Sequence, residues 1–389
     1  MARLTKPKIA RKRSKAFPAG DRRAPIVRFR DVSIVFGAKP HAALPLVDEK
    51  RSRREIEEAC GQVLGVADCT LDIGEGEIVV LMGLSGSGKS TLLRAVNGLN
   101  PVVRGHVEVR MGDGTWVNPH AVSARRLREL RQRRVAMVFQ AFGLLPWRTV
   151  RANVAFGMEI AGASRAEQRR KVDEQLALVG LDGWGERRVA ELSGGMQQRV
   201  GLARAFATDA PILLMDEPFS ALDPLIRSKL QDDLLELQAR LKRTIIFVSH
   251  DLDEALKLGN RIAIMEGGRI VQTGTARHIV SAPETDYVAE FVGSIDRQGV
   301  LTVRDVMTAE TAPFERPRPR EAVHLATSGV LDREGRELRS TVFVIVAPDT
   351  DLQRAIAALN RSGLPLLVEE DGRIVGTVTA EDVVRALER

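Results

Sequence analysis

The feature that most constrains this chain is a glycine-rich loop between an apolar run and a helical pattern. Residues 83–91 read GLSGSGKST; they follow the apolar run IVVLM and lead into TLLRAVNGL. In a strand–loop–helix context, the pattern GxxxxGK[ST] wraps a phosphate chain with backbone N–H groups, and the helix N-terminus adds partial positive charge. The sequence therefore predicts an α/β domain that binds a nucleotide through this loop.

The positions of the loop have separate expected roles. Lys89 is expected to reach the β- and γ-phosphates, and the Ser90 hydroxyl to coordinate Mg²⁺. The loop backbone surrounds the phosphates, so the predicted nucleotide contacts are Gly83, Ser85, Gly86, Ser87, Gly88, Lys89, Ser90 and Thr91.

Two acidic residues end a second apolar run, ILLMDEP at 212–218. A strand that is buried on both faces delivers such residues to the carboxyl edge of the sheet, where ligands bind in open α/β folds. Asp216 is expected to hold Mg²⁺ through water, and Glu217 to polarise the attacking water. A phosphate loop alone fits kinases, GTPases and ATPases, and these acids supply the second half of a hydrolytic site.

A third segment, LSGGMQQR at 192–199, narrows the class. Ser193 can cap the helix that follows, and Gly194 and Gly195 leave its N-terminus bare, which suits an anion. With the loop and the acids, this segment resembles the signature of ATP-binding cassette (ABC) proteins, over roughly residues 26–275. The resemblance implies ATP and Mg²⁺ as cofactors. It also implies a head-to-tail homodimer in which the signature of one copy, Gln197 included, closes over ATP held by the other.

The resemblance assigns four more residues. Gln140, after VAMVF, would touch Mg²⁺ and the attacking water; a surface glutamine is the alternative. His250, after IIFVS, would hydrogen-bond the γ-phosphate and hold Glu217, and Asp223 would lie in the loop that crosses the dimer interface. Phe36 would stack on adenine. Roughly 25 extra residues separate Phe36 from the strand VADCTLDI, so a plain core role for Phe36 stays open.

The alternation of apolar and helical segments predicts a mostly parallel sheet with helices on its faces. The predicted fold class is α/β: a P-loop ABC ATPase domain, with a mixed sheet core and a helical subdomain, followed by a small α+β domain. The expected boundaries are a basic flexible tail at 1–25, the ATPase domain at 26–295 with its helical subdomain at 141–192, and a CBS-like regulatory domain at 296–389.

Some local predictions follow from composition. Residues 38–65 are polar and charged and are predicted to form one exposed helix. The proline-rich TAPFERPRPRE at 311–321 is predicted to be a loop or linker. Residues 341–389 are predicted to contain strands at TVFVIVA, LPLLVEE and RIVGTVT and helices at DLQRAIAALNRSG and AEDVVRALER.

Charge and cysteine usage limit the partners. The net charge of +7 equals the seven basic residues of the first twenty positions, so the rest of the 389-residue chain sums to zero. We interpret this tail as a solvated arm, with attraction to an anionic membrane surface as the alternative. The neutral body argues against nucleic acid as a partner. The chain has two cysteines, and its N-terminus is basic without an apolar leader, which predicts a cytosolic location. It contains no apolar run near ~18 residues, which predicts that it has no membrane span.

The appendages point to one group of transporters. The insertion at 38–65 and the runs GVADCTLDIGEGEIVVLMGLSGSGKST and AMVFQAFGLLPWRTVRANVAFGMEI resemble the cassettes of glycine betaine/proline/choline importers, the choline branch somewhat more closely. That resemblance implies a separate membrane permease, a substrate-binding protein and a peripheral place on the cytoplasmic face of the bacterial inner membrane. Ala141 to Trp147 would form part of the groove for the permease, with plain core as the alternative.

The C-terminal segment resembles a CBS domain. LTVRDVMT at 301–308 looks like its lead-in, and GTVTAED at 376–382 matches the segment in which Thr379 and Asp382 would hydrogen-bond a nucleotide ribose. Only one such repeat is legible, so a structural or dimerising module is the alternative.

Two rival functions stay open. The cassette could serve an importer of another solute, such as a polyamine or an amino acid, or a soluble ATPase that acts on nucleic acid. The single cassette and the neutral body count against the nucleic-acid ATPase. The helix-containing tail does not look like the OB-like β-barrel in which polyamine cassettes usually end. The favoured function is therefore the osmolyte importer, which carries choline or glycine betaine.

Overall fold

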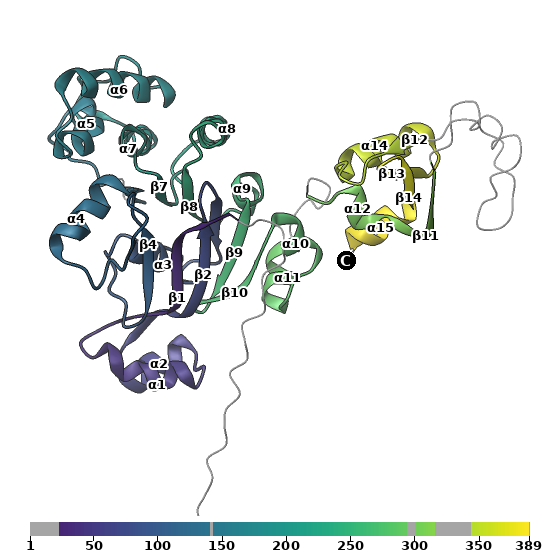
Figure 1. The fold of residues 1–389 in the computed structure, drawn as a ribbon, viewed down its shortest axis with the longest axis horizontal. Helices are drawn as coiled ribbons and strands as arrows, with labels where there is room; N and C mark the ends of the chain where they lie inside the picture. The colour runs from purple at the N-terminus through teal and green to yellow at the C-terminus, as the bar shows by residue number, and fades with distance from the viewer. Residues whose placement is uncertain (1–22, 141–142, 294–299, 316–343, 389) are drawn as a thin grey trace, which may run out of the picture.

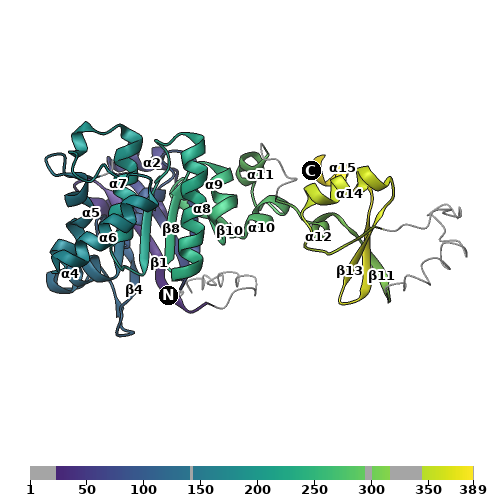
Figure 2. The same cartoon turned by 90° about the horizontal axis from the view of Figure 1, so that it is seen from above.

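The computed structural model describes residues 23–140, 143–293, 300–315 and 344–388. Their strands form three sheets, with orders β2-β1-β4-β5, β10-β9-β3-β8-β7-β6 and β11-β14-β13-β12. The first two sheets and most helices form one lobe, and the third sheet with its helices forms a second, smaller lobe at the C-terminal end (Figures 1 and 2).

The first sheet is antiparallel. It consists of β1 (Pro25–Phe36), β2 (Val63–Gly74), β4 (Arg104–Arg110) and β5 (Trp116–Val117). The predicted tail lies outside the described residues up to position 22.

The connection from β1 to β2 is not the single exposed helix that was predicted, and that prediction is wrong. It contains three short helices, η1 (Pro40–Ala43), α1 (Leu44–Asp48) and α2 (Arg53–Cys60). Capping causes the division, because Ser52 starts α2 and Gly61, at φ +65°, ends it. One face of the segment packs into a small core, made of Val35, Ala43, Val47, Ile56, Leu64 and Ala67.

The second sheet confirms the mostly parallel arrangement. Its strands are β3 (Ile78–Met82), β6 (Val135–Val138), β7 (Ile212–Asp216), β8 (Thr244–Ser249), β9 (Arg261–Glu266) and β10 (Arg269–Gly274). The first five of these are parallel to their neighbours, and β10 is antiparallel to β9. The carboxyl ends of β3, β7 and β8 therefore meet at one edge.

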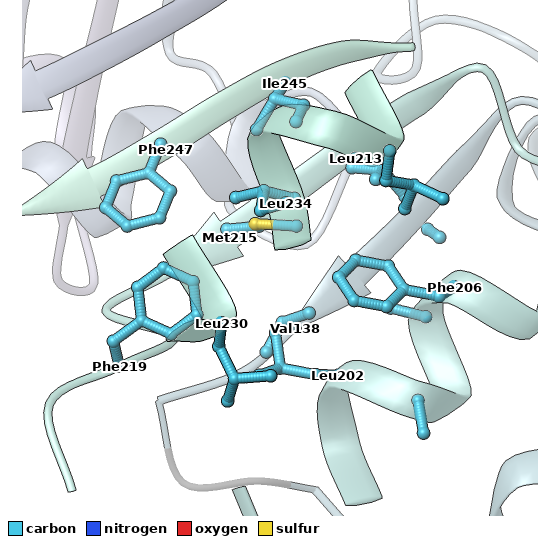
Figure 3. Close-up of a cluster of buried hydrophobic side chains, with 14 of the residues drawn as sticks. Val138, Leu202, Phe206, Leu213, Met215, Phe219, Leu230, Leu234, Ile245 and Phe247 are labelled. Carbon is cyan, nitrogen blue, oxygen red and sulfur yellow. The ribbon is translucent and has the colours of Figure 1, made fainter. Parts of the chain in front are cut away.

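Helices cover both faces of this sheet, because successive side chains of a strand point to opposite faces. On one face Leu213 and Met215 pack with α7 (Gly194–Ala207) and α8 (Pro224–Leu241), as Figure 3 shows. On the other face Leu214 packs with α3 (Lys89–Ala95) and the antiparallel sheet. β8 is followed in the chain by the helix α9 (Leu252–Leu258).

The region predicted as a helical subdomain contains α5 (Val150–Ile160), α6 (Arg165–Leu178) and the short η2 (Val189–Glu191). α4 (Ala124–Arg133) precedes it. Two residues of the predicted permease groove, Ala141 and Phe142, lie outside the described residues.

The C-terminal lobe begins after α10 (Ala276–Ser281) and α11 (Asp286–Val292). Its elements are α12 (Val303–Val306), β11 (Thr308–Glu315), β12 (Val344–Val346), α14 (Leu352–Ser362), β13 (Leu366–Glu370), β14 (Arg373–Val378) and α15 (Ala380–Glu388). The three strands and two helices predicted at 341–389 are confirmed.

The loop predicted at 311–321 is wrong for its first part. Residues up to Glu315 belong to β11, which pairs antiparallel with β14, so that Phe314 lies opposite Ile374. Backbone pairing with β14 outweighs the proline content, and residues 316–321 lie outside the described part. The core of this lobe also takes in Val280 of α10. None of the described helices is both apolar enough and long enough to span a membrane.

Candidate nucleotide site

The glycine-rich loop connects β3 to α3, and two of its glycines are required by their surroundings. Gly83 has a φ of +143°, and a Cβ there would lie 2.2 Å from the carbonyl oxygen of Met265. Gly88 has a φ of +104°, and a Cβ there would lie 2.5 Å from the carbonyl oxygen of Gly65. Both conformations disfavour L side chains, so the loop lies directly against its neighbours.

A pocket of about 340 Å³ opens beside this loop. Its walls are formed by the loop, the end of β1, the start of β2 and the carboxyl edge of the central sheet. The residues that line it are Phe36, Arg53, Val63, Leu64, Gly65, Ser85, Gly86, Gly88, Lys89, Ser90, Thr91, Gln140 and Glu217. Phe36 is 37% exposed, so its ring is open to the pocket instead of buried in the core.

The ammonium group of Lys89 lies under the loop. Its Nζ donates to the carbonyl oxygens of Gly83, at 2.7 Å, and Leu84, at 2.9 Å. Burial lowers the pKa of Lys89, and the nearby carboxylates of Glu217 and Asp216 oppose that shift. The charge is thus held at the position where a phosphate chain would meet it.

Asp216 ends β7 and is completely buried. Its Oδ1 accepts a hydrogen bond from the Ser90 hydroxyl at 2.6 Å, and its Oδ2 pairs with the Arg94 guanidinium at 2.9 Å. Arg94 was missed in the sequence. Its spacing of four residues from Ser90, which places both on one face of α3, is the signal that could have found it.

Glu217 is contacted by both residues that the sequence placed near it. Nε2 of Gln140 donates to its Oε2 at 3.3 Å, and Nδ1 of His250 lies 3.4 Å from its Oε1. The backbone of Glu217 has a φ of +48°, in the left-handed region. Three segments that are distant in sequence thus meet at one carboxylate, beside the loop.

Gln198 of α7 supports the backbone around Glu217, and no feature of the sequence pointed to this role. The side chain is 1% exposed. Its Nε2 donates to the carbonyl oxygen of Glu217 at 3.2 Å, and its Oε1 accepts from the N–H of Ala221 at 3.0 Å. A single side-chain amide thereby connects α7 to both Glu217 and the loop that follows it.

The signature residues make local contacts in their own chain. Ser193 caps α7 by accepting from the N–H of Met196, and Asp223 caps α8 by accepting from the N–H of Ile226 at 3.0 Å. Gln197 donates to the carbonyl oxygens of Val189 and Leu192. Among the described residues, those that line the pocket do not include Ser193, Gly194, Gly195, Gln197 and Asp223.

The fold and the site define a P-loop ATPase of the cassette type. A family model described as ABC transporter matches residues 66–220, and a second, described as CBS domain, matches residues 336–389. A solved dimeric bacterial ABC transporter cassette, MJ0796, is 27% identical at a TM-score of 0.55, covering 64% of this chain and 99% of that one. A post-hydrolysis structure of the same cassette, bound to ADP and Pi, matches equally.

Relatives extend along almost the whole chain. The glycine betaine/carnitine transport ATP-binding protein GbuA of Listeria monocytogenes is 39% identical, covering 93% of this chain and 97% of the relative. The glycine betaine/proline betaine protein ProV of Salmonella typhimurium is 43% identical over 89% and 86%. The trimethylamine N-oxide protein TmoW of Ruegeria pomeroyi is 42% identical over 87% and 96%. The chain belongs to the ABC transporter family, as an ATP-hydrolysing subunit in the group that includes GbuA and ProV.

Proposed function

We propose that this chain drives the import of glycine betaine or a closely similar quaternary ammonium osmolyte. The observation that carries the proposal is the similarity, over nearly all of both chains, to proteins named for glycine betaine, carnitine and proline betaine transport. Of the relatives described above, none is named for choline, a polyamine or an amino acid. Glycine betaine is therefore the solute we propose, and choline enters as a second arm of the test.

The chain itself would not contact the solute. A cage for a trimethylammonium group needs several aromatic side chains around the cation. The single tyrosine, Tyr287, instead faces the phosphate loop, because its hydroxyl oxygen accepts the N–H of Leu84 at 3.2 Å. Selection of the solute would fall to a substrate-binding protein and a separate permease, with this chain peripheral on the cytoplasmic face of the bacterial inner membrane.

The contacts around the pocket support a division of roles during hydrolysis. Lys89 and the loop backbone would hold the phosphates, and Phe36 would stack on adenine. The oxygens of Ser90 and Asp216, which lie 2.6 Å apart, suit a hard cation such as Mg²⁺, and Gln140 would complete that site. Mg²⁺, when bound, neutralises charge on the β- and γ-phosphates.

Glu217 would orient the attacking water and accept its proton. His250 and Gln140 contact its two carboxylate oxygens, so that they would fix the carboxylate and leave it directed at the pocket. Because both contacts exceed 3.2 Å, we expect them to shorten when the site closes.

Closure would come from a second copy of this chain. Ser193, Gly194 and Gly195 begin a helix whose N–H groups suit an anion, yet the pocket of the same chain is lined by other residues. A head-to-tail homodimer would bring them, with Gln197 and Asp223, to the partner's ATP. The dimeric state of the similar cassette MJ0796 supports this arrangement.

The CBS domain would regulate the transporter, with a nucleotide as its ligand. The two residues predicted to bind the ribose, Thr379 and Asp382, already form hydrogen bonds within the domain. Oδ2 of Asp382 accepts from the hydroxyl of Thr379 at 2.7 Å, and Oδ1 of Asp382 accepts from the hydroxyl of Thr308 at 3.2 Å. A ligand that binds there must replace these bonds. The proposal is tested by measuring the rate of ATP hydrolysis by the full chain at increasing concentrations of AMP.

Uptake in living cells tests the main proposal. Host cells whose only copy carries Glu217→Gln should lose uptake of labelled glycine betaine, whereas Glu236→Gln, at an exposed position of α8, should leave it intact. Uptake of labelled choline should be weaker than uptake of glycine betaine with the unaltered chain, and absent with Glu217→Gln. If the unaltered chain supports uptake of choline alone, or of neither solute, the proposed solute is wrong.

A further inference from the structure

The insertion between β1 and β2 brings a basic side chain into the nucleotide pocket. Arg53, the first residue of α2, lines that pocket together with Phe36 and Lys89. Its guanidinium donates hydrogen bonds to two carbonyl oxygens, that of Gly86 in the phosphate loop and that of Gly65 in β2. One side chain of the insertion thus joins the phosphate loop to β2, at the point where the two lie against each other.

The start of α2 fixes the direction of Arg53. Ser52 and Glu55 form a reciprocal capping box, which sets the first turn. Ile56, three residues after Arg53 and therefore on the same face, is completely buried. On the opposite face Arg54 is largely exposed and pairs with Glu58. The helix therefore turns Arg53 inward and Arg54 to solvent.

Contacts farther along the insertion hold it against the sheet. Arg269 donates to the carbonyl oxygen of Val47 at 3.0 Å, and Arg104 pairs with Asp48 at 2.6 Å. Both arginines also pair with Asp68 of β2. Because the insertion is tied to β2 at several points, the position of Arg53 is set by the fold and not by its own flexible side chain.

Among the residues that the structure describes, Arg53 has no acidic partner for its charge. Within the described part of the chain, no carboxylate forms an ion pair with it, and its Nε is buried without a hydrogen bond. Burial lowers the pKa of Arg53, but an arginine stays protonated at neutral pH. A partly buried cation without a counter-ion, in the wall of a phosphate pocket, favours the binding of an anion there.

We propose that Arg53 is a positioning residue of the nucleotide site, which holds Gly86 against β2 and adds a second side-chain positive charge, beside Lys89, to the field acting on the triphosphate. The inference rests on the ATP site described above and extends it. On this proposal the insertion contributes to nucleotide affinity, because α2, which carries Arg53, belongs to the insertion.

The test compares Arg53→Gln and Arg53→Lys in the full chain, with Arg54→Gln as the matched control. Binding of ATP and of ADP is measured by calorimetry at two salt concentrations, beside the thermal midpoint. Arg53→Gln should weaken ATP binding about tenfold, a typical loss for a hydrogen-bonded charge. It should weaken ADP binding less, because ADP carries less negative charge. Arg53→Lys should restore most of the affinity, and Arg54→Gln should bind like the unaltered chain.

Two results would overturn the proposal: unchanged affinity in Arg53→Gln, or an equal loss for ATP and ADP that lysine does not restore. Lys89→Ala separates failure of this inference from failure of the site, because it should lose ATP binding in either case. If Arg53→Gln does not fold, the unaltered chain provides the readout. ATP should then protect Arg53, but not Arg54, from modification by phenylglyoxal, and equal modification of both would refute the proposal.

Discussion

The guanidinium of Arg94 forms an ion pair with the carboxylate of Asp216, with 2.9 Å between Nη2 and Oδ2. Asp216 has no exposed side-chain surface, whereas the Arg94 side chain is 37% exposed. The buried acid at the end of β7 is therefore balanced by a cation from α3, the helix that starts at the phosphate loop. This ion pair connects α3, which begins at the phosphate loop, directly to the carboxyl end of β7.

Removing Arg94 should destabilise the fold. In Arg94→Ala, Asp216 keeps the hydrogen bond from Ser90 and the nearby charge of Lys89 but loses its ion-pair partner. Weaker compensation of a buried charge is costly. Since Arg94 is partly exposed, water can replace some of the lost interaction, and we expect the free energy of unfolding to fall by about 1–3 kcal/mol. Denaturant unfolding measures it. Arg170→Ala, which breaks the exposed pair with Glu174, should cost less than about 1 kcal/mol, and equal losses in the two variants would contradict the argument.

Gln198 should matter for hydrolysis more than for ATP binding. Replacement by alanine removes one of the hydrogen bonds to the carbonyl oxygen of Glu217, which then keeps those from Ser220, and it leaves the N–H of Ala221 without its side-chain partner. The backbone of Glu217 is then held less firmly. We expect Gln198→Ala to lower kcat by about tenfold or more while the affinity for ATP changes little. Steady-state hydrolysis and calorimetry separate the two quantities. Gln168→Ala is the control, because that side chain also donates to a backbone carbonyl, that of Ala163, but does not line the nucleotide pocket. A larger loss of ATP affinity than of kcat in Gln198→Ala would refute the assignment.

Much of the site could be predicted because its residues occupy fixed places along regular elements. A loop after a buried strand, acids at the end of another and a histidine after a third must meet at one sheet edge when the strands are parallel. Contacts that depend on tertiary packing could not be predicted. Gln198 looks like any polar residue of an amphipathic helix, and its task is visible only once α7 lies below Glu217. The insertion was misjudged for the same reason, since its charged sequence hides the small core around Ile56.

The two cysteines should differ strongly in reactivity. Burial raises the pKa of Cys69 to about 12, so that only about one thiol in ten thousand is ionised at pH 8. Cys60 is partly exposed at the end of α2. Iodoacetamide at pH 8 should therefore modify Cys60 in the native chain and reach Cys69 only after unfolding, as peptide mass spectrometry would show. Labelling in denaturant, where both thiols should react, is the control. Rapid native labelling of Cys69 would mean that the turn at Gly268, which covers it, opens readily.

Glu217 should combine an essential carboxylate with an unfavourable backbone. Its φ of +48° lies in the left-handed region, which costs an ordinary L residue about 1 kcal/mol but is tolerated by asparagine. Glu217→Ala and Glu217→Asn both remove the carboxylate, and we expect both to abolish hydrolysis. Only asparagine relieves the backbone, so its thermal midpoint should exceed that of the alanine variant by about 2 °C. Both variants lose the carboxylate contacts with Gln140 and His250, so these contacts do not contribute to the difference between them. Equal midpoints would show that the strand end imposes no strain, and hydrolysis by either variant would remove Glu217 from its proposed role.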